Sequence, residues 1–205
     1  MNGRRGRFVV LEGGDGSGKS TQVAALVKRL GAAGVEVVAT FEPGATPVGA
    51  AIRALLLDGS DPVDPVAEAL LMAADRAQHV ATVVEPALAR GAWVVSDRFV
   101  PSSLVYQGAV REVGVAAVEE LNRFATGALA PDLVLVLDVG DDVAEARAGA
   151  VPDRMEAEGR PFHASVRGAY RSLAADHGWT VVDGNGPLDE VAERIWAAVA
   201  PLLAR

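Results

Sequence analysis

Short apolar runs alternate along the chain with longer segments in which apolar residues recur every three or four positions. The short runs predict β-strands at residues 7–12, 35–41, 93–97, 133–138 and 180–183. The longer segments predict helices at residues 21–30, 48–57, 66–90, 115–126, 160–176 and 189–203. Because strands and helices alternate throughout, the pattern predicts an α/β fold with a parallel five-stranded sheet and helices on both faces.

The order of these segments also indicates where a ligand should bind. In such sheets ligands collect at the carboxyl ends of the strands, so polar residues that follow the strands are the first candidates. Residues 140–159 are the least regular stretch and are rich in Gly, Ala and charged residues, so we expect a lid segment at about 140–160. We see no linker, repeat or low-complexity tract and expect one domain over residues 1–205.

Composition narrows the class of protein. Half of the 205 residues are hydrophobic and 22% are charged, as in a globular protein with a full core. The formal net charge of −8 argues against a nucleic acid polymer as partner. There is no cysteine, which excludes disulfides and thiolate metal sites. No apolar stretch is long enough to span a bilayer, and the basic start does not resemble a signal peptide, so we expect no membrane partner and a cytoplasmic protein.

The segment between the first strand and the first helix carries a phosphate-binding motif. Residues 13–20 read Gly-Gly-Asp-Gly-Ser-Gly-Lys-Ser and match the pattern G-x-x-x-x-G-K-[ST]. Strand, glycine loop and helix are the structural context that this motif requires. We therefore expect a P-loop NTPase fold, with ATP as co-substrate and Mg²⁺ as cofactor. Lys19 is expected to reach the β- and γ-phosphates, and the Ser20 hydroxyl to hold Mg²⁺. The residues expected to bind ATP are Gly13, Gly14, Asp15, Gly16, Ser17, Gly18, Lys19, Ser20 and Thr21.

Charged residues near this loop are further candidates. Asp97 follows the third strand, where a carboxylate commonly helps to hold Mg²⁺; the alternative is a turn or helix-capping residue. Arg98 beside it is placed to bridge two phosphates. Asp15 lies inside the phosphate loop, and its carboxylate either faces a sugar hydroxyl or Mg²⁺ or points to solvent.

Two other groups of charges lie outside the loop. Arg76 is embedded in an apolar helical segment and needs an anionic partner, for which Asp75 and a substrate phosphate are equal candidates. His79 is expected to be a packed or solvated histidine, since no zinc-ligand spacing accompanies it. Arg147 and Arg154 fall in the expected lid, where they would either stabilise a transferring phosphoryl group or belong to a solvated charged loop.

Taken together, these motifs resemble the bacterial thymidylate kinases over nearly the whole chain. The phosphate loop is shared by many families, but an Asp-Arg pair at a strand end followed by Ser-Ser-x-x-Tyr-Gln-Gly is far more specific. The segments that carry the resemblance are residues 12–20, 42–44, 55–58, 74–79, 96–99, 102–108, 131–133 and 153–156.

This resemblance implies roles in the acceptor site. Asp15 would meet the 3′-hydroxyl of the acceptor sugar, while Arg76 and Arg98 would grip the acceptor phosphate. Tyr106 would lie under the sugar and exclude a 2′-hydroxyl. The expected acceptor-binding set is Asp15, Phe41, Met72, Arg76, Arg98, Ser103, Tyr106 and Gln107, with Ser103 and Gln107 near the base.

The resemblance also implies a catalytic set and an assembly. Gly16 and Ser17 stand where one branch of the family carries an arginine, so the catalytic arginine is expected from the lid. The expected catalytic residues are Lys19, Arg98, Arg154 and Arg147, and the expected metal ligands are Ser20 and Asp97. Family members are usually homodimers, and we expect the same here.

Two substitutions bear on the substrate. Met72 stands where the family usually has a phenylalanine that stacks on thymine, and Phe41 replaces the usual arginine before Glu-Pro-Gly. The function implied is transfer of the ATP γ-phosphate to dTMP to give dTDP. The substitutions leave two alternatives open: a kinase of another pyrimidine nucleoside monophosphate, such as dUMP or a modified pyrimidine, or a catalytically weak nucleotide-binding homologue.

Overall fold

The computed structural model describes residues 5–58, 61–147 and 158–204. Its strands are β1 (Phe8–Glu12), β2 (Val37–Phe41), β3 (Trp93–Asp97), β4 (Leu133–Asp138) and β5 (Thr180–Asp183). Its α-helices are α1 (Lys19–Ala32), α2 (Pro47–Arg53), α3 (Pro65–His79), α4 (Glu85–Ala89), α5 (Val100–Ser103), α6 (Val115–Ala125), α7 (Asp141–Arg147), α8 (Arg160–His177) and α9 (Leu188–Val199). Shorter helical segments are η1 (Ala54–Asp58), η2 (Val80–Val84), η3 (Leu104–Val110) and η5 (Ala200–Ala204).

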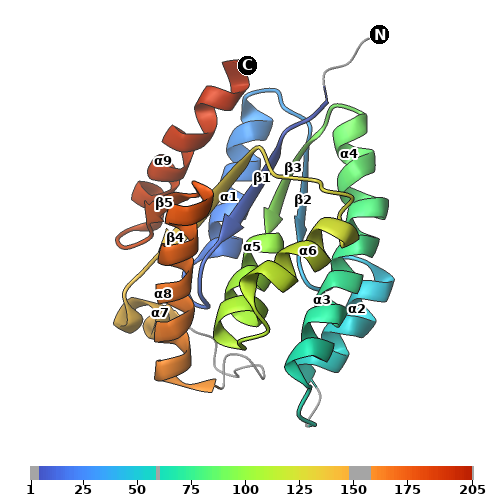
Figure 1. Cartoon of the computed structure of the whole chain (residues 1–205). Helices are drawn as coiled ribbons and strands as arrows, with labels where there is room; N and C mark the ends of the chain where they lie inside the picture. The colour runs from blue at the N-terminus through green and yellow to red at the C-terminus, as the bar shows by residue number, and fades with distance from the viewer. Residues whose placement is uncertain (1–4, 59–60, 148–157, 205) are drawn as a thin grey trace.

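The five strands form one parallel sheet in the order β2-β3-β1-β4-β5 (Figure 1). β1 lies at the centre, and its residues pair with β3 on one side and with β4 on the other. Leu11 is opposite Asp97, and Phe41 of β2 is also opposite Asp97. The register therefore brings the carboxyl ends of β1, β2 and β3 to the same edge of the sheet.

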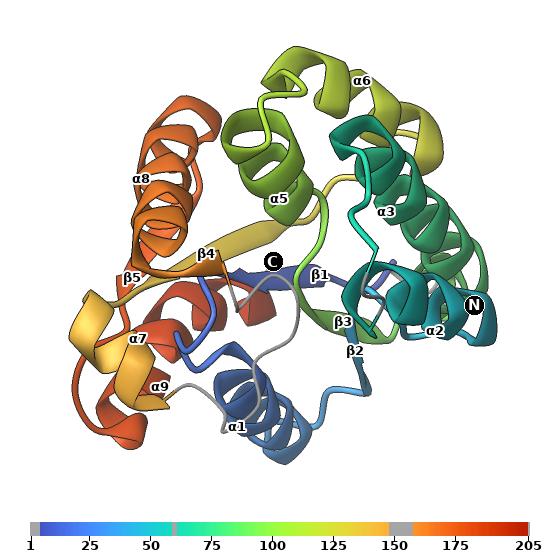
Figure 2. The same ribbon diagram turned by 90° about the horizontal axis from the view of Figure 1, so that it is seen from below.

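Helices cover both faces of the sheet, as Figure 2 shows from the end of the molecule. Val9 and Leu11 of β1 point to the face covered by α1 and α9, where they join a buried apolar cluster. Phe8 and Val10 point to the opposite face and pack with η2 and α4. This alternation follows from the two-residue period of a strand, and both of its faces are buried as expected in a parallel sheet.

The structure confirms the five expected strands and the six expected helical segments within a few residues. Two further helical segments were not expected. Residues 100–110 form α5 and η3. They were not predicted because residues 101–108 are all buried, so this segment lacks the amphipathic spacing by which helices are identified. Residues 141–147 form α7 inside the expected lid, whose residues 148–157 lie outside the described residues. No helix in the described part of the chain is both long and apolar enough to cross a membrane.

Candidate active site

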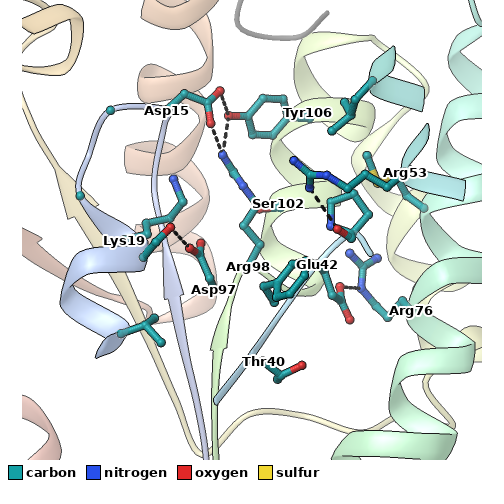
Figure 3. A pocket seen from close by; sticks show the side chains of 18 of the residues that line it. Asp15, Lys19, Thr40, Glu42, Arg53, Arg76, Asp97, Arg98, Ser102 and Tyr106 are labelled. Carbon is teal, nitrogen blue, oxygen red and sulfur yellow. Dashed lines mark hydrogen bonds and ion pairs between the residues drawn. The ribbon is translucent and has the colours of Figure 1, made fainter. Parts of the chain in front are cut away.

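A cavity of about 1010 Å³ lies at the carboxyl ends of β1, β2 and β3 (Figure 3). The expected site residues that line it are Asp15, Gly16, Gly18, Lys19, Ser20, Thr21, Phe41, Met72, Arg76, Asp97, Arg98, Tyr106, Gln107 and Arg147. Four expected residues are not in its wall: Gly13, Gly14, Ser17 and Ser103. Arg154 lies outside the described residues. Residues from five separate parts of the sequence thus meet in one cavity.

The phosphate loop connects β1 to α1 and needs its glycines for two reasons. Gly13, Gly16 and Gly18 all have positive φ, which residues with a Cβ atom rarely adopt. A Cβ on Gly16 would also lie 2.2 Å from the carbonyl oxygen of Ala144, so α7 approaches the loop too closely for a side chain. The loop is therefore held open by its glycines at the N-terminus of α1, where the helix favours an anion.

Lys19 is the buried cation of this loop. Its ammonium donates a hydrogen bond to the carbonyl oxygen of Gly14 at 2.8 Å. Burial lowers the pKa of Lys19 to about 8, and the nearby positive charge of Arg98 acts in the same direction. A phosphate at the loop would oppose both effects, so the site is arranged to gain an anion.

Ser20 and Asp97 form an oxygen-rich corner beside the loop. The Ser20 hydroxyl donates to Asp97 Oδ2 at 2.6 Å. The other carboxylate oxygen of Asp97 is buried and has no hydrogen-bond partner among the residues that the structure describes. A hydroxyl and an unsatisfied carboxylate oxygen are ligands that Mg²⁺ prefers, and this ion commonly takes only one or two protein ligands beside phosphates and water. These residues therefore fit a magnesium ion, and the turn residue considered for Asp97 does not account for the unsatisfied oxygen.

Arg98 lies at the end of β3 in an unusual backbone conformation. Its φ is 73°, a left-handed value uncommon for a residue with a Cβ. Its guanidinium donates to the carboxylate of Asp15 and lies 3.4 Å from the hydroxyl of Tyr106. Burial acts to raise the pKa of Asp15, but the charges of Arg98 and Lys19 outweigh it and hold that pKa below its usual value. Asp15 is therefore an anion in the cavity wall, paired there with Arg98.

Glu12 fixes the turn that carries Arg98. This fully buried carboxylate accepts hydrogen bonds from the Phe99 N–H at 2.8 Å and from the Ser102 hydroxyl at 2.7 Å. Tyr170 of α8 donates to the same carboxylate at 2.8 Å. Burial raises the pKa of Glu12, and the positive charge of Arg98 opposes that rise. A residue at the end of β1 thus holds the turn at the end of β3 in place.

Arg76 lies in the middle of α3 and is 2% exposed. Its Nε donates to Glu42 Oε2 at 2.8 Å, and its Nη2 donates to the carbonyl oxygen of Phe99 at 3.1 Å. Its Nη1 donates to Ser103 at 3.0 Å and to Asn122. An arginine has five N–H donors, so the described residues leave one for a ligand.

This network bears on three expectations from the sequence. The carboxylate that pairs with Arg76 is Glu42, whereas Asp75 accepts a hydrogen bond from the Gly44 N–H at 3.0 Å. With one remaining donor, Arg76 can offer a phosphate a single hydrogen bond and not the two of a bidentate contact, and the expected phosphate contact stays a prediction. His79 is fully buried between Glu42 and Thr40, as expected for a packed histidine.

Arg53 is a site residue that sequence reasoning missed. It lies at the end of α2 and lines the cavity, where it donates to the carbonyl oxygen of Pro43 at 3.0 Å. Figure 3 shows Arg53, Arg76 and Arg98 entering the cavity from three different elements. No motif marks Arg53; the available signal was a basic residue on a short helix that follows the end of β2. It keeps four N–H donors that take no partner among the described residues.

Ser103, Gln107 and Arg147 take positions that the sequence did not specify. Ser103 accepts a hydrogen bond from Arg76 and does not line the cavity. Its neighbour Ser102 does line the cavity. Gln107 lines the cavity from η3 together with Met72 of α3. Arg147, at the end of α7, donates to the carbonyl oxygens of Gly184 and Gly186 at 3.1 and 3.2 Å.

The fold and the site together define a class. A parallel sheet of this order, with a glycine-rich loop between β1 and α1 and an aspartate at the end of β3, is that of a P-loop NTPase. The family model described as thymidylate kinase matches residues 11–195. The chain belongs to the thymidylate kinase family.

Curated relatives match nearly the whole chain. The thymidylate kinase of Leifsonia xyli subsp. xyli is 50% identical over 196 residues, which cover 94% of this chain and 93% of the relative. That of Afipia carboxidovorans is 46% identical and covers 98% of this chain and 91% of the relative. That of a Synechococcus strain, JA-3-3Ab, is 47% identical and covers 96% of each.

Proposed function

We propose that the protein is a phosphotransferase that moves the γ-phosphate of ATP to dTMP and forms dTDP. The observation that carries this proposal is a single cavity with two kinds of wall. One side presents the phosphate loop with Lys19 and the Ser20–Asp97 corner. The other presents Arg98 and Tyr106, which contact Asp15 of the loop and which a protein that only binds or hydrolyses ATP would not need.

The acceptor phosphate is assigned to Arg98 and Arg53. Both line the cavity, and Arg53 keeps most of its donors. The two terminal nitrogens of Arg98 already contact neighbouring oxygens, so a phosphate would meet its Nε or take the place of one of these neighbours: Gly13, Asp15, Ser102, Tyr106 and Tyr170. Asp15 and Tyr106 meet the sugar, as the family resemblance implies. Arg76 is assigned to the base because its one remaining N–H suits a single carbonyl oxygen better than a phosphate.

The reaction is a direct in-line transfer that needs little covalent chemistry from the protein. The acceptor phosphate is already an anion, so no strong general base is required. Lys19 neutralises charge on the donor phosphates, while Arg98 and Arg53 hold the acceptor in line. Mg²⁺ held by Ser20 and Asp97 supplies further charge neutralisation on the phosphates when bound. The lid also contributes an arginine; because the guanidinium of Arg147 is engaged with two backbone carbonyls, Arg154 is the stronger candidate.

We also propose that two chains associate as a homodimer. Five large apolar side chains of α2, η1, α3 and α6 are exposed in the single chain: Val48, Leu55, Val66, Leu70 and Phe124. The side chain of Phe124 is 87% exposed. Burial of such side chains against a second copy would remove this apolar area from water. We place the protein in the cytoplasm, where ATP is available.

The test is ADP release from ATP and Mg²⁺ with dTMP, dUMP, dCMP, UMP, dGMP and AMP as separate acceptors. We expect dTMP to give the highest kcat/KM, with Met72 covering the base in place of an aromatic ring. A higher kcat/KM for a purine acceptor, or ADP release that does not depend on any acceptor, would contradict the proposal. A higher kcat/KM for dUMP than for dTMP would support the same reaction with a different acceptor.

A further inference from the structure

Glu68 is a buried carboxylate beside the cavity but not in its wall. It is 1% exposed and lies on α3, four residues before Met72 and eight before Arg76. This spacing places all three residues on one face of the helix. Met72 and Arg76 line the cavity from that face. Glu68 therefore lies next to the acceptor end of the site, although nothing in the proposed reaction uses it.

Within the described residues, Glu68 contacts the side chains of Gln107 and Arg111. The side-chain Nε2 of Gln107 donates to Glu68 Oε1 at 2.9 Å, and Arg111 Nε lies 3.8 Å from the same oxygen. An ionised carboxylate can only accept hydrogen bonds, so the half of the Gln107 amide that faces it has to be the NH₂ group. The carbonyl oxygen of the amide is thereby turned away from Glu68. Arg111 supplies the opposite charge that a buried carboxylate requires.

We propose that Glu68 is a specificity-determining positioning residue. By fixing the amide of Gln107, it makes the carbonyl oxygen the group that meets the acceptor base. This inference rests on the proposed function, because it places the base beside Gln107. Glu68 itself touches no substrate and acts only through that amide.

The consequence is a choice among pyrimidines. Thymine and uracil carry an N–H at ring position N3 beside a carbonyl oxygen, whereas cytosine carries an unprotonated N3 beside an NH₂ group. A carbonyl from Gln107 and the remaining N–H of Arg76 match the first pattern and oppose the second. If the amide were free to rotate and exchange the positions of its oxygen and its NH₂ group, the NH₂ group could donate a hydrogen bond to the N3 of cytosine. A fixed amide therefore rejects dCMP.

Two variants of Glu68 separate this role from simple packing. Glu68→Gln keeps the shape, but its NH₂ group can donate to the Gln107 oxygen, while its one oxygen is shared between Gln107 and Arg111. Glu68→Asp alters the shape but can still only accept. We expect Glu68→Gln to lower the dTMP to dCMP ratio of kcat/KM by about tenfold or more, chiefly through the two acceptor KM values. We expect Glu68→Asp to retain more of the ratio than Glu68→Gln.

A double-mutant comparison tests the route of the effect. In a Gln107→Leu background there is no amide to orient, so Glu68→Gln should leave the ratio unchanged there. Glu190→Gln, an exposed carboxylate of α9 paired with Arg194, is the matched control and should not alter the ratio. Thermal unfolding of each variant verifies that it is folded.

The possible results distinguish two failures. If wild-type protein does not turn over dTMP, the proposed function fails before Glu68 is examined. If wild-type protein prefers dTMP to dCMP and folded Glu68→Gln keeps that preference, the role of Glu68 is wrong. The role is also wrong if Glu68→Gln lowers the ratio equally with and without Gln107, or if Glu68→Asp loses more of the ratio than Glu68→Gln.

Discussion

Arg98 and Asp15 form an ion pair between the turn after β3 and the phosphate loop, although 83 residues separate them in sequence. The pair links the arginine assigned to the acceptor phosphate with the carboxylate assigned to the acceptor sugar. Its geometry depends on a left-handed residue at 98 and on the buried carboxylate of Glu12, which holds the following residues. Several measurable consequences follow from this arrangement and from its neighbours.

Removing the charge of Asp15 should weaken acceptor use. Asp15→Asn loses the ion pair with Arg98 but keeps a side chain of the same size, so we expect kcat/KM for dTMP to fall by about tenfold to a hundredfold. The measurement is steady-state kinetics with each substrate varied. Asp176→Asn, an exposed residue of α8, is the control. A rise in the KM for ATP with an unchanged KM for dTMP would contradict the assignment of Asp15 to the acceptor.

Lys19 should make ATP binding depend on pH. Its pKa is lowered by burial and by Arg98 to about 8, so above that value the free protein holds this side chain largely neutral. Bound phosphates favour the charged form and raise its pKa, so ATP binding should take up protons at about pH 9 and almost none at about pH 6.5.

Calorimetry of ATP binding in two buffers with different ionisation enthalpies measures this uptake. Lys19→Arg is the control, because an arginine stays charged throughout this range. Equal uptake by the wild type and Lys19→Arg would show that another group titrates. No uptake by the wild type at the higher pH would contradict the lowered pKa of Lys19.

Asp97 should set the requirement for Mg²⁺. Asp97→Asn removes the anionic ligand beside Ser20, so we expect the Mg²⁺ concentration for half-maximal turnover to rise by about tenfold or more. Asp138→Asn is a close control, because Asp138 also ends a strand and also has a buried oxygen with no hydrogen-bond partner in the described part of the chain, yet does not line the cavity. An unchanged requirement in folded Asp97→Asn would remove this residue from the metal site.

Tyr106 should discriminate between sugars through its ring. The centroid of the ring lies 5.2 Å from the guanidinium carbon of Arg98, and its hydroxyl donates to Asp15 at 3.3 Å. We expect Tyr106→Ala to let UMP compete better with dUMP as an acceptor, and Tyr106→Phe to preserve most of the preference, because exclusion of a 2′-hydroxyl is steric. Equal loss in both variants would assign the discrimination to the hydroxyl.

Phe124 should report on the homodimer. Phe124→Glu places a charge where we expect apolar contact with a second chain, so the mass measured by sedimentation should fall from two chains to one. Leu203→Glu, which is 39% exposed at the end of the chain, is the control for a charge at another exposed apolar position. A wild-type protein that is already a monomer, or an unaffected dimer in Phe124→Glu, would contradict the proposed interface.

The sequence predicted the sheet and the phosphate loop because both depend on local patterns. Short apolar runs identified all five strands, and the loop motif identified Lys19 and Ser20, which line the cavity. Helical spacing in the same way identified the segments that cover the sheet. The helical segment at residues 100–110 was not predicted, because a helix buried on all sides has no polar face and therefore shows no helical periodicity in its sequence.

Only the tertiary structure decided how the charged residues are paired. Arg76 required an anion, but its pairing with Glu42 joins residues 34 positions apart and depends on how α3 packs beside the end of β2. Arg53 and Glu68 carry no motif, and their relation to the cavity comes from the placing of α2 and α3. Burial, charge pairing and the number of donors left on each guanidinium are properties of packed neighbours, and no spacing along the chain encodes them.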